Sequence, residues 1–210
     1  LTNYLLRQAA EFRRIALARP DVAMQLTHNG RVSLRLAAGR REARVRSLLG
    51  DDFLNAARLV EADAGPLRLT GYASLPAYSR SSRDAQFFYV NGRFVRDKLL
   101  SHALREAYLD MLHGSRYPAY CIFVEVDPAN VDVNVHPAKT EVRFRDGRAV
   151  HQFVFHAVQR TLSSPLAGAR DDTSGSFTAM SPAPPLAAQR PPPVPPRTTE
   201  TAWPQRQESL

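Results

Sequence analysis

The feature that most limits the fold of this 210-residue chain is the distribution of its prolines. Ten of the sixteen prolines lie at or after Pro165, many of them in the run SPAPPLAAQRPPPVPPRTTE. Proline disrupts helix and sheet interiors, and this segment has few large apolar side chains to offset the entropy lost on ordering. We therefore predict one folded domain over residues 1–165 and a disordered, Pro-rich linker with polyproline II character over residues 166–210.

Two Asn-Gly pairs in the folded part indicate β-hairpins. Asn29-Gly30 separates residues 22–27 from 31–36, and Asn91-Gly92 separates the apolar run QFFYV from RFV. Asn and Gly both accept the positive φ that a two-residue hairpin turn requires. The strongly apolar character of the second hairpin predicts that at least one of its arms is central in a sheet. Further strands are predicted at residues 58–62, 67–75, 120–126, 131–135 and 141–144.

Helical spacing of apolar residues predicts helices between these strands. They cover residues 5–18, 44–57 with a break near Gly50, 97–112 with Asp97 as the N-cap, and 148–162. Strands and helices alternate without a regular βαβ repeat. This order favours an α+β sandwich, a mixed sheet with helices packed on one face.

The composition excludes several classes of protein. Cys121 is the single cysteine, so a disulfide within the chain and a cysteine-based zinc site are excluded. No apolar run approaches the length of a membrane span, and the N-terminal stretch lacks the long apolar centre of a signal peptide. We expect a cytoplasmic protein with no membrane partner.

The formal net charge of +8 lies entirely in the folded part. From residue 163 to the end, four Arg and four acidic residues cancel. A basic domain with a neutral tail suits a polyanionic partner such as nucleic acid. An Arg-rich composition that only maintains solubility explains the same charge.

A first basic segment carries Arg93, Arg96 and Lys98 on a hairpin arm and at the start of a helix. A helix N-terminus with nearby cations is suited to phosphate binding. Alternatively, the two arginines pair with acidic residues of the same domain and Lys98 is only solvated.

A second segment, VDVNVHPAKTEVRF, begins at Val131 and holds Lys139 after a proline-containing turn. Such a turn presents a long cation at a defined place. The chain has 26 Arg and only two Lys, and a compact ammonium can meet a phosphate oxygen as a point charge. A solvent-exposed turn lysine without a special role fits this pattern as well.

Together these segments resemble the MutL family of DNA mismatch-repair proteins. The resemblance rests on FYVNGRFVRD and VDVNVHPAKTEVRF, with RRIALARPDV and the first Asn-Gly hairpin as a weaker match, and it covers residues 12–162. It implies a fold like domain 2 of ribosomal protein S5, which type II topoisomerases share.

The resemblance also implies roles for particular residues. Lys139 matches the lysine that contacts the γ-phosphate of ATP in the preceding ATPase domain of the family. Lys98 falls where the family has a basic DNA-binding residue, which is Arg in some members, and Arg93 and Arg96 match the same basic surface. The residues that support these motifs are Asn91, Gly92, Asn134, His136 and Pro137.

In the family, ATP and Mg²⁺ belong to an ATPase domain N-terminal to this region. This chain has no Gly-rich phosphate loop of either common type, so we expect it to bind neither alone and not to be an enzyme by itself. The resemblance implies four partners: DNA, a MutS-type mismatch-recognition protein, a downstream nuclease or helicase, and a second copy of the intact protein. It also implies that the protein acts in the bacterial cytoplasm, in association with the nucleoid. The alternatives are the transducer domain of a topoisomerase-like ATPase, or an RNA-binding module that uses Phe87, Phe88 and Tyr89.

Overall fold

A computed structural model describes residues 2–135, 137 and 139–164 of the chain. Its helices are α1 (Thr2–Ala18), α2 (Arg41–Leu49), α3 (Asp51–Asn55), the 3₁₀ turn η1 (Pro128–Asn130), α4 (Lys98–Ala107) and α5 (Gly147–Ser163). Its strands are β1 (Met24–His28), β2 (Arg31–Leu36), β3 (Ala57–Ala64), β4 (Leu67–Ser74), β5 (Ser79–Arg80), β6 (Gln86–Val90), β7 (Arg93–Val95), β8 (Tyr117–Pro118), β9 (Tyr120–Val126), β10 (Val131–Asp132) and β11 (Arg143–Phe144). The predicted linker over 166–210 lies outside the described residues, as does His136.

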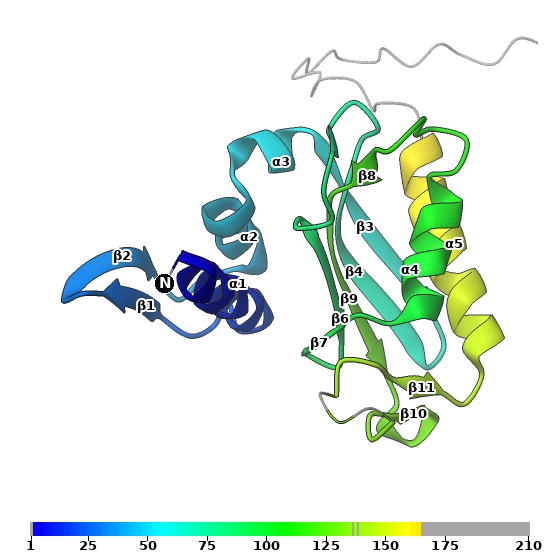
Figure 1. The fold of residues 1–210 in the computed structure, drawn as a ribbon. Coiled ribbons are helices and arrows are strands. Elements are labelled where there is room, and N and C mark those ends of the chain that lie inside the picture. Colours follow the sequence, from blue (N-terminus) through cyan, green and yellow to red (C-terminus); the bar gives the residue numbers. More distant parts are fainter. Residues whose placement is uncertain (1, 136, 138, 165–210) are drawn as a thin grey trace, which may run out of the picture. The chain divides into compact units, whose positions relative to one another are not determined.

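Five strands form the main sheet in the order β3-β4-β9-β6-β7 (Figure 1). All neighbours are antiparallel except β6 and β9, so the sheet is mixed. Gly71 allows β4 and β9 to approach closely, because a Cβ there would collide with the backbone of Cys121. The predicted central position of one hairpin arm is confirmed, since β6 lies between β9 and β7.

Each face of the sheet has its own hydrophobic core. On β9, Ile122 and Val124 point into the core formed with α4 and α5, whereas Cys121 and Phe123 point into the core formed with α1, α2 and α3. This alternation follows from the two-residue period of a strand. The predicted α+β fold is therefore confirmed, and the structure adds the N-terminal helices on the second face (Figure 1).

The structure differs from the prediction in several places. Helices cover both faces of the sheet and not one, and the strand predicted over 141–144 covers only Arg143–Phe144. The strand predicted over 131–135 ends at Asp132, whose carboxylate accepts a hydrogen bond of 2.8 Å from the backbone N–H of Asn134 and starts a turn. The helix predicted over 97–112 ends at Ala107, and the two-residue pair β5–β8 was not predicted. Within the described part of the chain, none of the helices has the length and apolar character to span a membrane.

Candidate functional site

The turn between β6 and β7 is fixed by Asn91. Asn91 and Gly92 have φ values of 49° and 76°, as a two-residue hairpin turn requires. The Asn91 side chain donates a hydrogen bond of 2.8 Å to the carbonyl of Val126 and accepts one of 2.9 Å from the N–H of the same residue. Asn91 therefore extends the β6–β9 pairing past the end of the strand and holds the start of β7 in place.

The three predicted basic residues of this segment are exposed. Arg93 lies in β7, Arg96 in the connection to α4, and Lys98 at the first position of α4. Asp97 between them is buried, and its carboxylate caps α4 by accepting a hydrogen bond of 3.1 Å from the N–H of Leu100. Among the described residues, no ion pair involves any of the three cations, so intradomain pairing does not explain them.

Lys139 lies on the loop between β10 and β11. Its side chain is exposed and its φ is 51°, a left-handed conformation that is uncommon for residues other than Gly and Asn. The loop is anchored below its tip, because β10 pairs with β11 through Val131 and Phe144, and Val142 and Phe144 are buried in the core. Lys139 therefore lies on an exposed loop whose two ends are held by strand pairing and by core packing.

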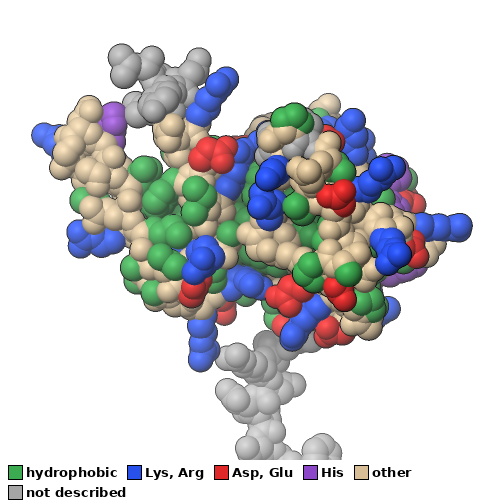
Figure 2. Space-filling model, turned by 90° about the horizontal axis from the view of Figure 1, so that it is seen from below, with side chains coloured by type: hydrophobic (Ala, Val, Ile, Leu, Met, Phe, Trp, Pro, Cys, Tyr) green, Lys and Arg blue, Asp and Glu red, His purple; other side chains and the backbone are tan. Residues whose placement is uncertain are grey.

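The structure brings the two predicted segments together. The backbone N–H of Arg96 donates a hydrogen bond of 2.7 Å to the carbonyl of Thr140, the residue after Lys139. The β10–β11 loop is therefore tied to the connection that carries Arg96 and leads into Lys98. Figure 2 views the molecule from the end where this loop lies and shows Lys and Arg side chains spread over it.

A groove of about 1230 Å³ runs along the β7 edge of the sheet, between α1 on one face and α4 on the other. Two acidic residues, Asp84 and Asp97, belong to its described lining, and Asp97 is engaged as the helix cap. Seven cations line it: Arg13, Arg14, Arg83, Arg96, Lys98, Arg105 and Arg116. The groove therefore has a strongly positive potential that attracts polyanions.

The Phe94 ring on β7 organises part of this groove. The guanidinium of Arg14 from α1 lies 4.6 Å from the ring centroid, and that of Arg96 lies 5.8 Å from it. Arg14 also pairs with Glu11 on α1. Cation–π contacts by themselves hold planar cations without neutralising them. They leave N–H donors of Arg96 available to an incoming phosphate.

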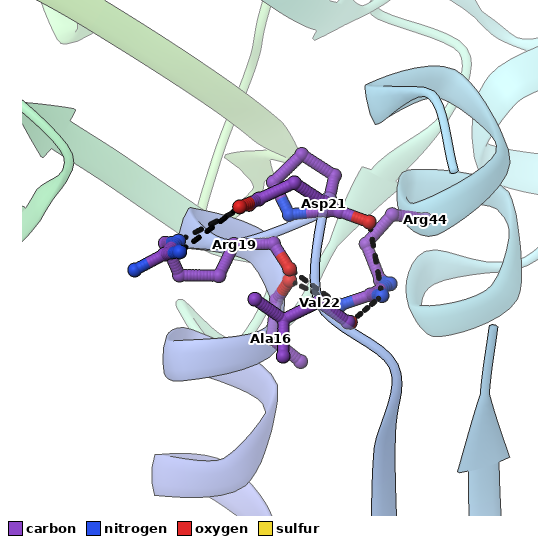
Figure 3. Close-up of polar contacts among 6 residues, drawn as sticks. Ala16, Arg19, Asp21, Val22 and Arg44 are labelled. Atoms are coloured by element: carbon purple, nitrogen blue, oxygen red, sulfur yellow. Dashed lines mark hydrogen bonds and ion pairs between the residues drawn. The ribbon is translucent and has the colours of Figure 1, made fainter. Parts of the chain in front are cut away.

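Arg44 fixes the position of α1, the helix that supplies Arg13 and Arg14. Its guanidinium is buried and donates five hydrogen bonds of 2.6–3.2 Å to backbone carbonyls. Figure 3 shows those to Ala16, Arg19 and Val22. The acceptors lie at the end of α1 and in the segments on either side of the β1–β2 hairpin: Ala16, Arg19, Pro20, Val22 and Ala37. A cation at a helix C-terminus also complements the helix dipole.

Some of these residues could not be found from local sequence patterns. Lys98 and Arg105 are seven residues apart, and this spacing predicts that they share one face of a helix. Their proximity to α1, Arg83 and Arg116 depends on the tertiary fold and could not be predicted from this spacing. Arg93 is exposed at the hairpin, yet it does not line the groove. Asn134 and Pro137 are exposed on the Lys139 loop, and His136 lies outside the described residues.

The aromatic residues proposed for RNA binding are in the core. Phe87 and Phe88 are each 5% exposed, and Tyr89 is fully buried, with its hydroxyl donating to the carbonyl of Arg14 at 2.8 Å. Stacking on bases requires exposed rings. These three residues therefore give the RNA-binding alternative no support.

Comparison with known proteins assigns the family. The family described as "DNA mismatch repair protein, C-terminal domain" matches residues 45–163, more than half of the chain. The chain is 59% identical over 161 residues to the DNA mismatch repair protein MutL of Thiobacillus denitrificans and 62% identical over 152 residues to that of Herminiimonas arsenicoxydans. The chain belongs to the MutL family of DNA mismatch-repair proteins. This result favours mismatch repair over the topoisomerase alternative.

The alignments cover most of this MutL-family chain but a small part of each relative. They span 77% and 72% of the chain, and 27% and 25% of the two relatives. The chain thus spans about a quarter of the length of the curated relatives it matches.

The fold also matches a solved structure. The crystal structure of the N-terminal domain of a DNA repair protein superposes with a TM-score of 0.62 at 22% sequence identity, covering 73% of this chain and 51% of that one. At this identity the match shows a shared fold only.

Proposed function

We propose that this MutL-family segment couples the nucleotide state of an ATPase domain to DNA binding. The hydrogen bond between the N–H of Arg96 and the carbonyl of Thr140 carries the proposal. It joins the loop that presents Lys139 to the segment that supplies Arg96 and Lys98 to the basic groove. A shift of this loop on nucleotide binding would then move the cations at the start of α4.

In this proposal the basic groove binds the DNA backbone. Its cations come from α1, the β7–α4 connection, α4 and the segments that hold Arg83 and Arg116. The exposed Lys98 stands at the N-terminus of a ten-residue helix, where backbone N–H groups also favour phosphate. Contacts of this kind position a protein on DNA without reading the sequence. Binding should therefore be weak, sequence-independent and sensitive to salt.

Lys139 would contact the γ-phosphate of ATP bound, with Mg²⁺, in a preceding ATPase domain. Its exposed position on an anchored loop fits a residue that reaches into a neighbouring domain. A point charge there would stabilise the negative charge that develops during phosphoryl transfer. The isolated chain should show only background ATP hydrolysis, and turnover by it would contradict this assignment.

The remaining roles concern the intact protein. We propose that it acts as a homodimer in the bacterial cytoplasm and passes the signal of a MutS-type mismatch-recognition protein to a nuclease or helicase. Membership of the MutL family supports these roles.

Fluorescence anisotropy with a labelled DNA duplex tests the DNA-binding role. Lys98→Glu should weaken binding and lower the slope of log Kd against log salt by about 1, because one phosphate contact is lost. Arg31→Glu makes the same charge change on the exposed β1–β2 hairpin, outside the groove, and should leave the slope unchanged. Equal effects of the two variants would remove Lys98 from the site.

The nucleotide role needs the chain joined to its ATPase domain. Lys139→Ala should then reduce the turnover number and weaken the effect of ATP on DNA binding, whereas DNA binding without nucleotide should be retained. Lys139→Arg keeps the charge but not the compact ammonium, and should restore only part of the turnover. Unchanged turnover in Lys139→Ala would make Lys139 an ordinary exposed lysine.

A further inference from the structure

Three potential metal ligands meet where α4 and α5 lie side by side. Within the described part of the chain, His102, Glu106 and His151 form the group of His and acidic side chains that could hold a metal ion. The Nδ1 atom of His102 lies 2.9 Å from the Nε2 atom of His151. The Oε2 atom of Glu106 lies 3.8 Å and 3.4 Å from these two nitrogens.

These distances allow one metal ion to reach all three donor atoms. A circle through three atoms at these separations has a radius of about 2.0 Å, so one point lies about 2.0 Å from all three. Zinc binds His nitrogen and carboxylate oxygen at about 2.0–2.2 Å. An ion near the centre of the triangle would therefore satisfy all three ligands without rearrangement of either helix.

The helices hold the ligands in place. His102 and Glu106 are one turn apart on α4, and His151 comes from α5. The two helices pack on each other through Leu104, Val150 and Val154, which are at most 4% exposed and lie in one core. In Figure 2 His side chains lie at the right, on the side of α4 and α5, beside basic and acidic side chains.

The ligand side chains are accessible from solvent. The side chains of His102, Glu106 and His151 are 68%, 43% and 23% exposed, so an ion can enter and a fourth position remains for water or an external ligand. Two imidazoles and one carboxylate are ligands typical of zinc and neighbouring divalent transition metals, whereas Mg²⁺ and Ca²⁺ prefer oxygen alone.

We propose that His102, Glu106 and His151 bind a divalent transition metal ion of the zinc class. The ion would link α4 to α5 from outside the core. Neither Lys98 nor Lys139 is a ligand, although His102 also lines the basic groove. The two imidazoles already contact each other and the Glu106 carboxylate, so metal titration tests whether an ion binds to these three groups.

Isothermal titration of the chelator-stripped, tag-free chain with Zn²⁺ tests the site. We expect one ion per chain, an affinity at least about tenfold weaker in His102→Ala and in His151→Ala, and no change in His28→Ala, which removes an exposed histidine from the β1–β2 hairpin. Zn²⁺ should also raise the Tm of the wild type but not that of the double variant His102→Ala/His151→Ala.

A spectroscopic readout keeps the test independent of folding effects. Co²⁺ at one equivalent should give the visible absorption of a four- or five-coordinate site in the wild type, and the band should be absent in the double variant, whose circular dichroism should match the wild type. The proposal is overturned if the wild type binds no stoichiometric Zn²⁺, or if the double variant binds it with the affinity of the wild type.

Discussion

Replacing Arg44 with methionine should destabilise the domain far more than the same change at Arg46, on the same helix. Arg44 is 3% exposed, and its guanidinium donates hydrogen bonds to five backbone carbonyls. Each buried carbonyl left without a donor costs about 1–3 kcal/mol, so the loss of this guanidinium should cost about 3–5 kcal/mol even if water reaches some of the five acceptors. Arg46 pairs with Glu42 and Asp51 on the surface, and exposed pairs of this kind contribute little to stability.

Urea unfolding followed by circular dichroism measures this difference. With a slope of about 2 kcal/mol/M, the Arg44→Met midpoint should fall by about 1.5–2.5 M and the Arg46→Met midpoint by about 0.5 M or less. Arg44→Lys should lie between them, because an ammonium has only three donors for the five carbonyls. Midpoints of Arg44→Met and Arg46→Met within about 0.5 M of each other would refute the role given to Arg44.

Three further predictions concern the core. Gly71→Ala should destabilise the fold by more than about 2 kcal/mol in thermal unfolding, since its Cβ would collide with the β9 backbone. Burial raises the pKa of the Cys121 thiol, so Ellman's reagent at pH 8 should modify it in urea but not in the native chain; rapid native labelling would show that the thiol is accessible. Burial also raises the pKa of Tyr108 and Tyr120 above the value of about 10 in unfolded chains. The unfolded state therefore loses protons that the folded state keeps, and the free energy of unfolding should fall as pH rises above about 10; a flat profile from pH 9 to 11 would contradict this.

The sequence correctly predicted turns, helix breaks and helix caps, because each depends on residues that are close together in the chain. Both Asn-Gly turns form where expected, with positive φ at all four residues, and α2 and α3 are separated at Gly50, whose φ is 90°. Asp97 caps α4 as predicted. In each case, a side chain or a missing Cβ acts on the backbone within a few residues.

One local competition and the features that depend on distant contacts were not predicted. The strand expected after Val131 is short because Asp132 bonds to the backbone of Asn134, a local option that the alternating valines outweighed in the prediction. The groove needs α1 and α4 on opposite faces of one sheet edge, and no sequence spacing encodes that. Nothing in the local sequence distinguishes Arg44 from the other arginines, because its five acceptors lie 7 to 28 residues away.

The central claim, that the β7-edge groove binds DNA, is tested most directly by a charge-matched pair of triple variants. Arg13, Lys98 and Arg105 lie in the groove, and all three are exposed. Their replacement by Gln should lower the salt slope of DNA binding by up to about 2.7, at about 0.9 per phosphate contact.

The control variant replaces three exposed arginines outside the groove by Gln: Arg31, Arg35 and Arg40. It removes the same net charge and should keep a slope close to that of the wild type. If both triple variants lower the slope equally, binding depends on net charge alone, and the groove is not the DNA site.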